Sequence, residues 1–224
     1  MDDQNSAALQ LLDGAARDVV ASMHARKPQP GAGGGLFEMD GRTRIPLAEG
    51  ALLFRLVSRL RPAQSIEIGL AYGFSTAFIL CALKKNGHGR HIAIDPFQYT
   101  HWSGIGAEVP NRIGCKDIFT IIARRSYQAL AEMAAAGFKA EFIFIDGDHL
   151  FDSVFVDFYL ADKLVPDGGI IAFDDAHWPS SKKVCAFIAR NRPDYELVKP
   201  VFDRVAVFRK VADDRRHWDH FADF

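Results

Sequence analysis

The fold of this chain is decided by the stretch Glu67-Ile68-Gly69-Leu70-Ala71-Tyr72-Gly73-Phe74-Ser75-Thr76. It follows a short apolar segment and opens a segment with helical spacing. Two glycines and an alanine let the backbone pass close to a ligand, and the start of a helix offers N–H groups without intrahelical partners. Taken alone, the stretch is equally compatible with a plain tight connection between a strand and a helix.

On both sides of this turn, strand-like and helix-like segments alternate. The strands are expected at Ser65–Ile68, His91–Ile94, Phe119–Ile122, Phe142–Ile145 and Ile170–Phe173, and the helices at Ser75–Lys85, Tyr127–Ala136, Phe151–Leu164 and Ser180–Asn191. Strands that are apolar at consecutive positions are covered on both faces, which is typical of a parallel sheet between helix layers.

The last two strands are expected to differ from the others. Glu196–Val198 and Val205–Arg209 are joined by the short connection Lys199–Arg204, which favours an antiparallel pair at the sheet edge. The sequence therefore predicts an α/β fold. It is a doubly wound, Rossmann-like and mostly parallel seven-stranded sheet, with an antiparallel edge strand and helices on both faces.

The N-terminal part has a different pattern. Apolar residues at helical spacing predict one helix from Ala7 to Met23, and the stretch Lys27–Gly35 breaks regular structure as a flexible joint. A second helix is expected from Pro46 to Leu60. We expect residues 1–35 to form an appendage, either a lid or a dimer arm, and residues 36–224 to form the ligand-binding domain.

Composition and charge exclude several classes of function. The net charge is −1, so no overall field attracts nucleic acid or an anionic membrane. The 3 cysteines have no zinc-site spacing, which fits reduced thiols. No segment reaches the roughly 18 apolar residues of a membrane span, and the N-terminus lacks a basic segment leading into an apolar run. We expect a cytoplasmic protein that binds neither nucleic acid nor membranes.

The residue that ends the second strand indicates the class of ligand. Asp95 can accept hydrogen bonds from both hydroxyls of a ribose, so the turn and this acid together favour a nucleoside. A dinucleotide site prefers Gly-x-Gly-x-x-Gly, whereas the chain has Glu-x-Gly-x-Ala-x-Gly. Glu67 would repel a pyrophosphate but can help to hold a cationic amino-acid tail. This favours S-adenosylmethionine over NAD.

At these positions the chain resembles the class I S-adenosylmethionine-dependent methyltransferases. The resemblance covers roughly Pro46 to Phe208 and is closest to the small O-methyltransferase branch that contains the macrocin and mycinamicin sugar O-methyltransferases. It implies that the methionine end lies against the acid and turn residues, the ribose against the acid of the second strand, and the adenine against the residue that opens the helix after the third strand. The implied cofactor-binding residues are Glu67, Gly69, Ala71, Gly73, Ser75, Asp95, Ser126 and Asp146, with Glu49-Gly50 near the cofactor.

Acids also follow the fourth and fifth strands. If these strands are neighbours, Asp146, Asp174 and Asp175 converge at one rim, where like charges are costly unless a cation or protons intervene. Hard oxygen ligands suit Mg²⁺ or Ca²⁺, so these three are the candidate metal ligands. The resemblance agrees, although the fifth-strand pair is Glu-Asp in the macrolide enzymes and Asp-Asn in catechol O-methyltransferase. The alternative is that such acids cap the following helices, as Asp152 could.

His149 is the candidate general base. It matches the histidine proposed for that role in the sugar O-methyltransferases, and histidine ordinarily titrates near neutral pH. We expect it to deprotonate a sugar or phenol hydroxyl on a small-molecule acceptor, with His177 as a second base or a surface residue. A homodimer is possible. The alternative functions are a non-catalytic S-adenosylmethionine-binding module and an NAD-linked oxidoreductase.

Overall fold

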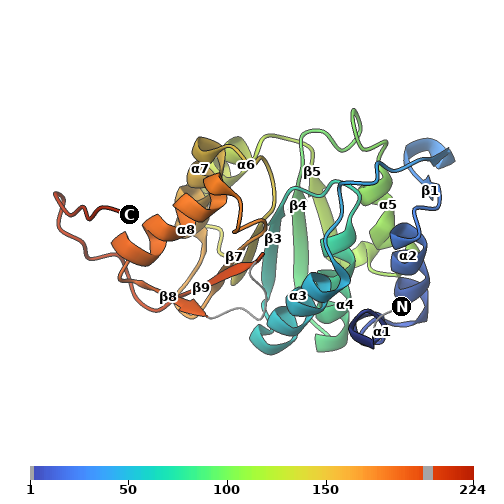
Figure 1. Cartoon of the computed structure of the whole chain (residues 1–224), viewed down its shortest axis with the longest axis horizontal. Coiled ribbons are helices and arrows are strands. Elements are labelled where there is room, and N and C mark those ends of the chain that lie inside the picture. The colour runs from blue at the N-terminus through green and yellow to red at the C-terminus, as the bar shows by residue number, and fades with distance from the viewer. Residues whose placement is uncertain (1–2, 199–203) are drawn as a thin grey trace.

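The computed structural model describes residues 3–198 and 204–224, and a seven-stranded sheet runs through its middle (Figure 1). The strands are β3 (Gln64–Ile68), β4 (Arg90–Ile94), β5 (Phe119–Ile122), β6 (Phe142–Ile145), β7 (Ile170–Phe173), β8 (Tyr195–Val198) and β9 (Ala206–Lys210). Their order in the sheet is β5-β4-β3-β6-β7-β9-β8. The five strands from β3 to β7 are parallel, and β9 runs antiparallel to both β7 and β8. The predicted fold class is confirmed, with the antiparallel strand one place in from the edge.

The position of the ligand crevice follows from the strand order. The chain fills the sheet outward from β3 through β4 to β5 and then returns to the other side of β3 with β6. In open α/β sheets, ligands bind beyond the carboxyl ends of the strands at such a reversal. The turn after Ile68 and the residues after Ile145 therefore lie at the expected place.

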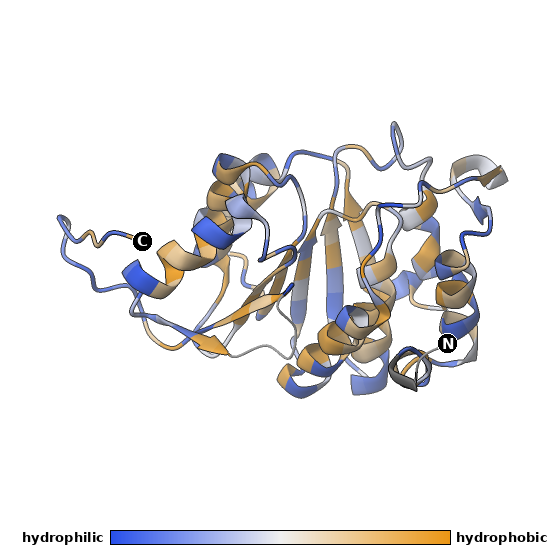
Figure 2. Cartoon of the chain, in the orientation of Figure 1, coloured by the Kyte–Doolittle hydropathy of each residue, from blue (hydrophilic) through white to orange (hydrophobic). Residues whose placement is uncertain are grey.

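Helices cover both faces of the sheet (Figure 1). One face carries α3 (Leu47–Leu60), α4 (Phe74–Asn86) and α5 (Ile105–Arg112), and the other carries α6 (Ser126–Ala135), α7 (Phe151–Leu164) and α8 (Pro179–Asn191). Successive residues of β6 explain both layers, because Phe144 packs with the first set and Ile145 with the second. Apolar positions along these elements appear orange in Figure 2. Within the described residues, no helix combines the length and apolar character that crossing a membrane requires.

The predicted helix Ala7–Met23 is wrong as a single element. The structure has α1 (Asp3–Leu9) and α2 (Gly14–His24). Asp13 separates them because its side chain accepts a hydrogen bond from the N–H of Ala16 at 3.0 Å and so caps α2. The apolar spacing continues across the break, which is why the pattern did not reveal it. Both helices bury apolar side chains against the domain.

The glycine-rich stretch has more structure than expected. Its strand β1 (Gln29–Pro30) pairs with β2 (Leu36–Phe37), and a 3-10 turn, η1 (Ala32–Gly34), lies between them. Gln29 is fully buried and accepts a hydrogen bond from Arg112 at 2.8 Å. The prediction that regular structure stops throughout Lys27–Gly35 is therefore wrong, since this amide anchors the stretch to α5.

Two further segments were not anticipated from the sequence. Part of the long stretch after β4 forms α5, whose short length and internal Pro110 hide its helical character, and η2 (Lys116–Ile118) precedes β5.

Of the predicted connection between the last two strands, residues 199–203 lie outside the described part of the chain. The C-terminal residues run along α8, where the side chain of Asn191 and the backbone of Ala222 exchange hydrogen bonds at 2.8 and 2.9 Å.

Candidate active site

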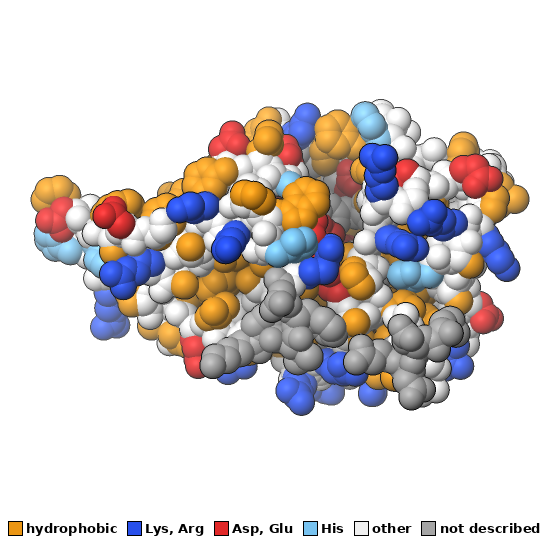
Figure 3. Space-filling model, viewed as in Figure 1, with side chains coloured by type: hydrophobic (Ala, Val, Ile, Leu, Met, Phe, Trp, Pro, Cys, Tyr) orange, Lys and Arg blue, Asp and Glu red, His pale blue; other side chains and the backbone are white. Residues whose placement is uncertain are grey.

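Two cavities meet at the turn after β3. They have volumes of about 500 and 410 Å³, and Thr43, Gly69, Ala71, Asp146 and His149 line both of them. Figure 3 shows a recess near the middle of this face, with acidic, basic and histidine side chains around it. The site is thus one cleft with two parts that join across the glycine turn, and we call them the larger and the smaller cavity.

The turn needs its glycines for two different reasons. Gly69 has φ +90°, and a Cβ atom on it would lie 2.0 Å from the carbonyl oxygen of Asp146. Gly73 has φ +83° and starts α4 in the left-handed conformation. The close approach of Gly69 to Asp146 brings the ends of β3 and β6 together at the floor of both cavities.

Glu67 lies beneath the turn and lines neither cavity. Its side chain is fully buried, the hydroxyls of Ser75 and Thr76 donate to its carboxylate, and Nε2 of His91 lies 3.3 Å from it. Because Glu67 lines neither cavity, its carboxylate would not directly contact a cationic ligand tail in this arrangement, although the sequence had led us to expect that contact. Its carboxylate instead ties the first turn of α4 to β3, and Ser75 does line the larger cavity.

Asp95 lines the smaller cavity and also holds the turn in place. One carboxylate oxygen accepts hydrogen bonds from the N–H groups of Leu70 and Ala71 at 3.2 and 2.8 Å. The other accepts one from the N–H of Phe97 at 2.8 Å. Asp95 is 3% exposed, so it is fixed by these three donors at the cavity wall.

The rest of the smaller cavity is aromatic. Phe97 and Trp102 line it, and the guanidinium of Arg125 lies 4.7 Å from the centre of the Phe97 ring. Ser126, the first residue of α6, also lines it. A cavity with a carboxylate at one end and flat apolar walls suits a nucleoside.

Four carboxylates gather on one side of the larger cavity. Asp146, Asp174 and Asp175 line it as the sequence predicted, and Glu49 in the first turn of α3 lies directly behind them. Burial and the charge of Asp174 raise the pKa of Glu49 to about 9. Burial and the neighbouring acids also raise the pKa values of Asp146 and Asp174. The acids thus converge, at a cost to their ionised forms.

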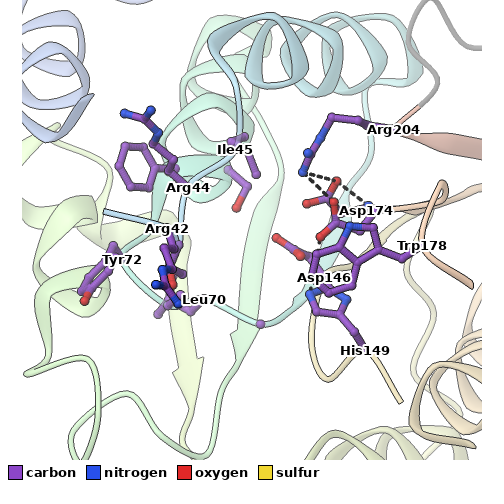
Figure 4. A pocket seen from close by; sticks show the side chains of 17 residues that line it. Arg42, Arg44, Ile45, Leu70, Tyr72, Asp146, His149, Asp174, Trp178 and Arg204 are labelled. Carbon is purple, nitrogen blue, oxygen red and sulfur yellow. Dashed lines mark hydrogen bonds and ion pairs between the residues drawn. The ribbon is translucent and has the colours of Figure 1, made fainter. Parts of the chain in front are cut away.

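Arg204 lies against these acids (Figure 4). Its Nη2 donates to Oδ1 of Asp175 at 2.6 Å and lies 3.9 Å from Oδ1 of Asp174. Its Nε is 3.5 Å from Oε2 of Glu49. We call the four carboxylates Glu49, Asp146, Asp174 and Asp175 the acidic rim, and Arg204 pairs with three of them.

His149 occupies the wall that the two cavities share. Its Nε2 is 3.6 Å from Oδ2 of Asp175, and its ring centre is 4.7 Å from that of Trp178. The side chain is 32% exposed, so it is accessible from the cleft. His177 lines neither cavity, although its Nδ1 is 3.9 Å from Oδ1 of Asp175. The geometry places His149, rather than His177, where a ligand can meet it.

Comparison with known proteins identifies the central part of the chain. Residues 66–176, which contain the turn, Asp95, Asp146 and His149, match the model of a family described as a methyltransferase domain. This segment is thus similar to a methyltransferase domain, and we call residues 66–176 the matched segment.

Curated relatives and a solved structure extend the likeness beyond the matched segment. A tapetum-specific methyltransferase from Arabidopsis thaliana is 32% identical over 147 residues, which cover 65% of the chain and 58% of the relative. A caffeoyl-CoA O-methyltransferase from Populus kitakamiensis is 29% identical over 136 residues, covering 60% of the chain and 55% of the relative. The chain thus spans less than two thirds of these relatives.

The solved structure is an O-methyltransferase from Bacillus cereus in complex with SAH. It superposes with a TM-score of 0.64 at 18% identity, over 95% of this chain and 92% of that protein. The likeness shows that the matched segment and its flanking elements share this fold.

Three contributors to the cleft were not predicted from the sequence. Gln98 is fully buried, and with its amide suitably oriented it donates to the carbonyl of Ala71 at 3.0 Å and accepts from the N–H of Gly106 at 3.1 Å. Gln98 was not predicted because a single glutamine in an aromatic stretch matches no sequence motif. The residues 42–45, which include Arg42 and Arg44, line the larger cavity from the segment before α3. The third contributor is Arg204, which precedes the last strand.

The acidic rim does not fit a divalent metal ion in this arrangement. The part of the chain that the structure describes contains no group of three or more His, Cys, Asp or Glu side chains placed to hold one. Arg204 already occupies Asp175 and approaches Asp174, which are two of the three expected ligands. The expected Mg²⁺ or Ca²⁺ site is therefore not formed by these residues as they lie.

Proposed function

We propose that this chain is an S-adenosylmethionine-dependent O-methyltransferase that acts on a small-molecule hydroxyl. The observation that carries the proposal is the joined pair of cavities with His149 on their shared wall. One cavity can take the cofactor, the other the acceptor, and the candidate base lies between them. The match of residues 66–176 to a methyltransferase domain supports the cofactor.

The smaller cavity suits the adenosine part of the cofactor. Asp95 would accept hydrogen bonds from the ribose hydroxyls, and the adenine would lie among Phe97, Trp102 and Ser126. The methionine end would then lie over the turn at Gly69, close to Asp146. Glu67 contributes by fixing this turn through Ser75 and Thr76. In the proposal, these contacts direct the methyl group towards the larger cavity.

The larger cavity would hold the acceptor. A phenol is favoured over a sugar, because the Populus relative is named for a caffeoyl substrate and a caffeoyl group carries phenolic hydroxyls. His149 would take the hydroxyl proton, and Asp175 at 3.6 Å would orient the ring and stabilise the imidazolium. The aromatic face of Trp178 beside His149 offers a surface on which a flat acceptor can stack.

The reaction that follows is an in-line displacement. The acceptor oxygen forms a bond to the methyl carbon as the carbon–sulfur bond breaks, and the sulfonium becomes a neutral thioether. The proton moves from the hydroxyl to His149 and then to solvent. The chain supplies orientation and proton removal, which together account for most of what such a transfer requires. No step of this proposal passes through a metal ion.

The test combines cofactor binding with turnover on a panel of phenols, catechols and glycosides. For His149→Ala and His149→Gln we expect turnover to fall about 10²-fold to 10⁴-fold. The dissociation constant of S-adenosylmethionine, measured by calorimetry, should stay unchanged. The matched control is His220→Ala, which removes an exposed histidine of the C-terminal tail and should leave both values unchanged.

Four results would contradict different parts of the proposal. Full turnover in His149→Ala would contradict the role of His149 as general base but would leave the proposed methyl transfer standing. Failure of the unaltered protein to bind S-adenosylmethionine would overturn the function itself. Cofactor binding without methyl transfer to any acceptor would favour the non-catalytic binding module, and tighter binding of NAD would favour an oxidoreductase.

A further inference from the structure

The guanidinium of Arg204 lies where the acidic rim needs a positive charge. It makes a hydrogen-bonded ion pair with Asp175 at 2.6 Å and lies 3.9 Å from Asp174 (Figure 4). It also approaches Glu49 at 3.5 Å. Among the described residues, it is the only lysine or arginine that forms an ion pair with these acids. A guanidinium keeps its charge at every relevant pH. The rim therefore has a permanent cation of its own.

The sheet topology explains why an arginine reaches this rim. Parallel strands bring their carboxyl ends here, whereas the antiparallel β9 brings its amino end. Ala206, the first residue of β9, pairs with Phe173, the last residue of β7. The carbonyl of Arg204 also accepts a hydrogen bond from the N–H of Ala176 at 2.7 Å. The backbone of Arg204 is thus tied to the segment that carries Asp174 and Asp175.

The burial of the acids indicates that the positive charge of Arg204 stabilises them. Glu49 is 2% exposed, and within residues 3–198 and 204–224 the permanently charged group that pairs with its carboxylate is the guanidinium of Arg204. Asp174 and Asp175 are 5% and 7% exposed. Carboxylates buried this close together are costly to ionise unless a cation lies beside them. The nearest nitrogen of a permanent cation to each of Glu49, Asp174 and Asp175 belongs to Arg204.

We propose that Arg204 is the resident cation of the acidic rim and stands in place of a divalent metal ion. It is a positioning residue, because it holds Asp175, which in turn lies beside His149. A metal ion on Asp174 and Asp175 would have to displace the guanidinium from a 2.6 Å ion pair. The catalytic part rests on the proposed function, whereas the exclusion of metal does not and can be measured without any substrate.

The experiment compares Mn²⁺ binding by the unaltered protein, Arg204→Gln and Arg204→Lys. Binding is followed from the loss of the free-ion electron paramagnetic resonance signal, and thermal unfolding is recorded with and without Mn²⁺. The matched control is Arg209→Gln, which removes an exposed arginine from β9, the strand that follows Arg204. Turnover with and without EDTA is recorded in parallel.

We expect the unaltered protein, Arg204→Lys and Arg209→Gln to bind Mn²⁺ weakly. Arg204→Gln should bind it about tenfold more tightly, because a permanent positive charge has left the acids. Mn²⁺ should then raise the melting temperature of Arg204→Gln alone. The turnover of the unaltered protein should be insensitive to EDTA.

Three results would overturn the inference. The first is tight Mn²⁺ binding by the unaltered protein that Asp174→Asn abolishes. The second is unchanged Mn²⁺ affinity in a folded Arg204→Gln. The third is a loss of turnover in EDTA that Mg²⁺ restores. If Arg204→Gln fails to fold, the Mn²⁺ titration of the unaltered protein and of Arg204→Lys still decides the matter. A protein that lacks transferase activity but rejects Mn²⁺ would contradict only the proposed function.

Discussion

At the scale of single residues, the site depends on close contacts that leave no room for a side chain. Gly69 combines a positive φ of +90° with a carbonyl oxygen 2.0 Å from the place of a Cβ atom. That oxygen belongs to Asp146, so the two cavities share a floor because this one residue has no side chain. A backbone carbonyl cannot move aside as a flexible side chain can.

We therefore expect Gly69→Ala to lower the free energy of unfolding by more than about 3 kcal/mol, since backbone strain and a steric clash combine. The matched control is Gly137→Ala. Gly137 has φ +71° with nothing within 4 Å of its Cβ position, so only the strain of about 1 kcal/mol applies. Urea unfolding measures both variants. Equal losses would show that the contact with Asp146 carries no cost.

At the scale of elements, one buried acid joins α7 to the two antiparallel strands. Asp162 accepts hydrogen bonds from Arg192 at 2.7 Å and from the hydroxyl of Tyr195 at 2.9 Å, and Lys210 lies 3.3 Å away. Burial alone would raise its pKa, but the hydrogen bond and charge of Arg192, with the charge of Lys210, lower it to about 2. This cluster fixes the edge strands that carry Arg204.

For Asp162→Asn we expect the free energy of unfolding at pH 7 to fall by about 2–4 kcal/mol, because Arg192 loses a buried partner. The pKa of Asp162 is lower in the folded than in the unfolded chain, so its stabilisation is present above pH 3.8 and is lost as the pH falls towards about 2. Melting curves recorded from about pH 5 down to about pH 2 cover this change in protonation of Asp162. The curves of the two proteins should therefore converge as the pH falls.

The control for this prediction is Asp152→Asn, which removes an exposed acid from the first turn of the same helix. Its effect on stability should stay within about 0.5 kcal/mol. A difference between Asp162→Asn and the unaltered protein that is the same at every pH would contradict the assignment of the lowered pKa to Asp162.

At the scale of the whole molecule, the N-terminal helices pack on the same core as the sheet. Met23 is 1% exposed and Val20 is fully buried, and both belong to the apolar cluster that contains residues of α4 and α5. His24 adds an edge contact to Phe74, with ring centres 4.8 Å apart. Whether residues 1–35 act as a lid or a dimer arm stays a prediction, but their packing indicates that they unfold with the rest.

Met23→Ala tests this cooperativity. We expect a loss of about 2–4 kcal/mol with a single unfolding transition, because the cavity opens inside the common core. Val156→Ala is the control, since Val156 on α7 is 40% exposed. Fluorescence and circular dichroism should report the same midpoint. A separate early transition that involves only part of the signal would show that α1 and α2 are an independent unit.

Local patterns sufficed for the strands and for most of the site. Consecutive apolar residues such as Phe142–Ile145 predict a buried strand wherever they lie, and the parallel sheet then places Asp95, Asp146 and Asp174 at one edge. The two halves of the N-terminal region were not separable, because the cap at Asp13 interrupts the helix without interrupting its apolar spacing.

The turn and the positions of the acids at the strand ends were thus determined by the sequence alone, because each depends on neighbours within one strand and its following helix. Only the tertiary structure decided which way Glu67 faces and what neutralises the rim. Glu67 turns inward because hydroxyls of α4 lie above it, and Arg204 reaches Asp175 because β9 pairs antiparallel with β7. Such pairings join residues that are distant in the chain, and no local pattern carries them.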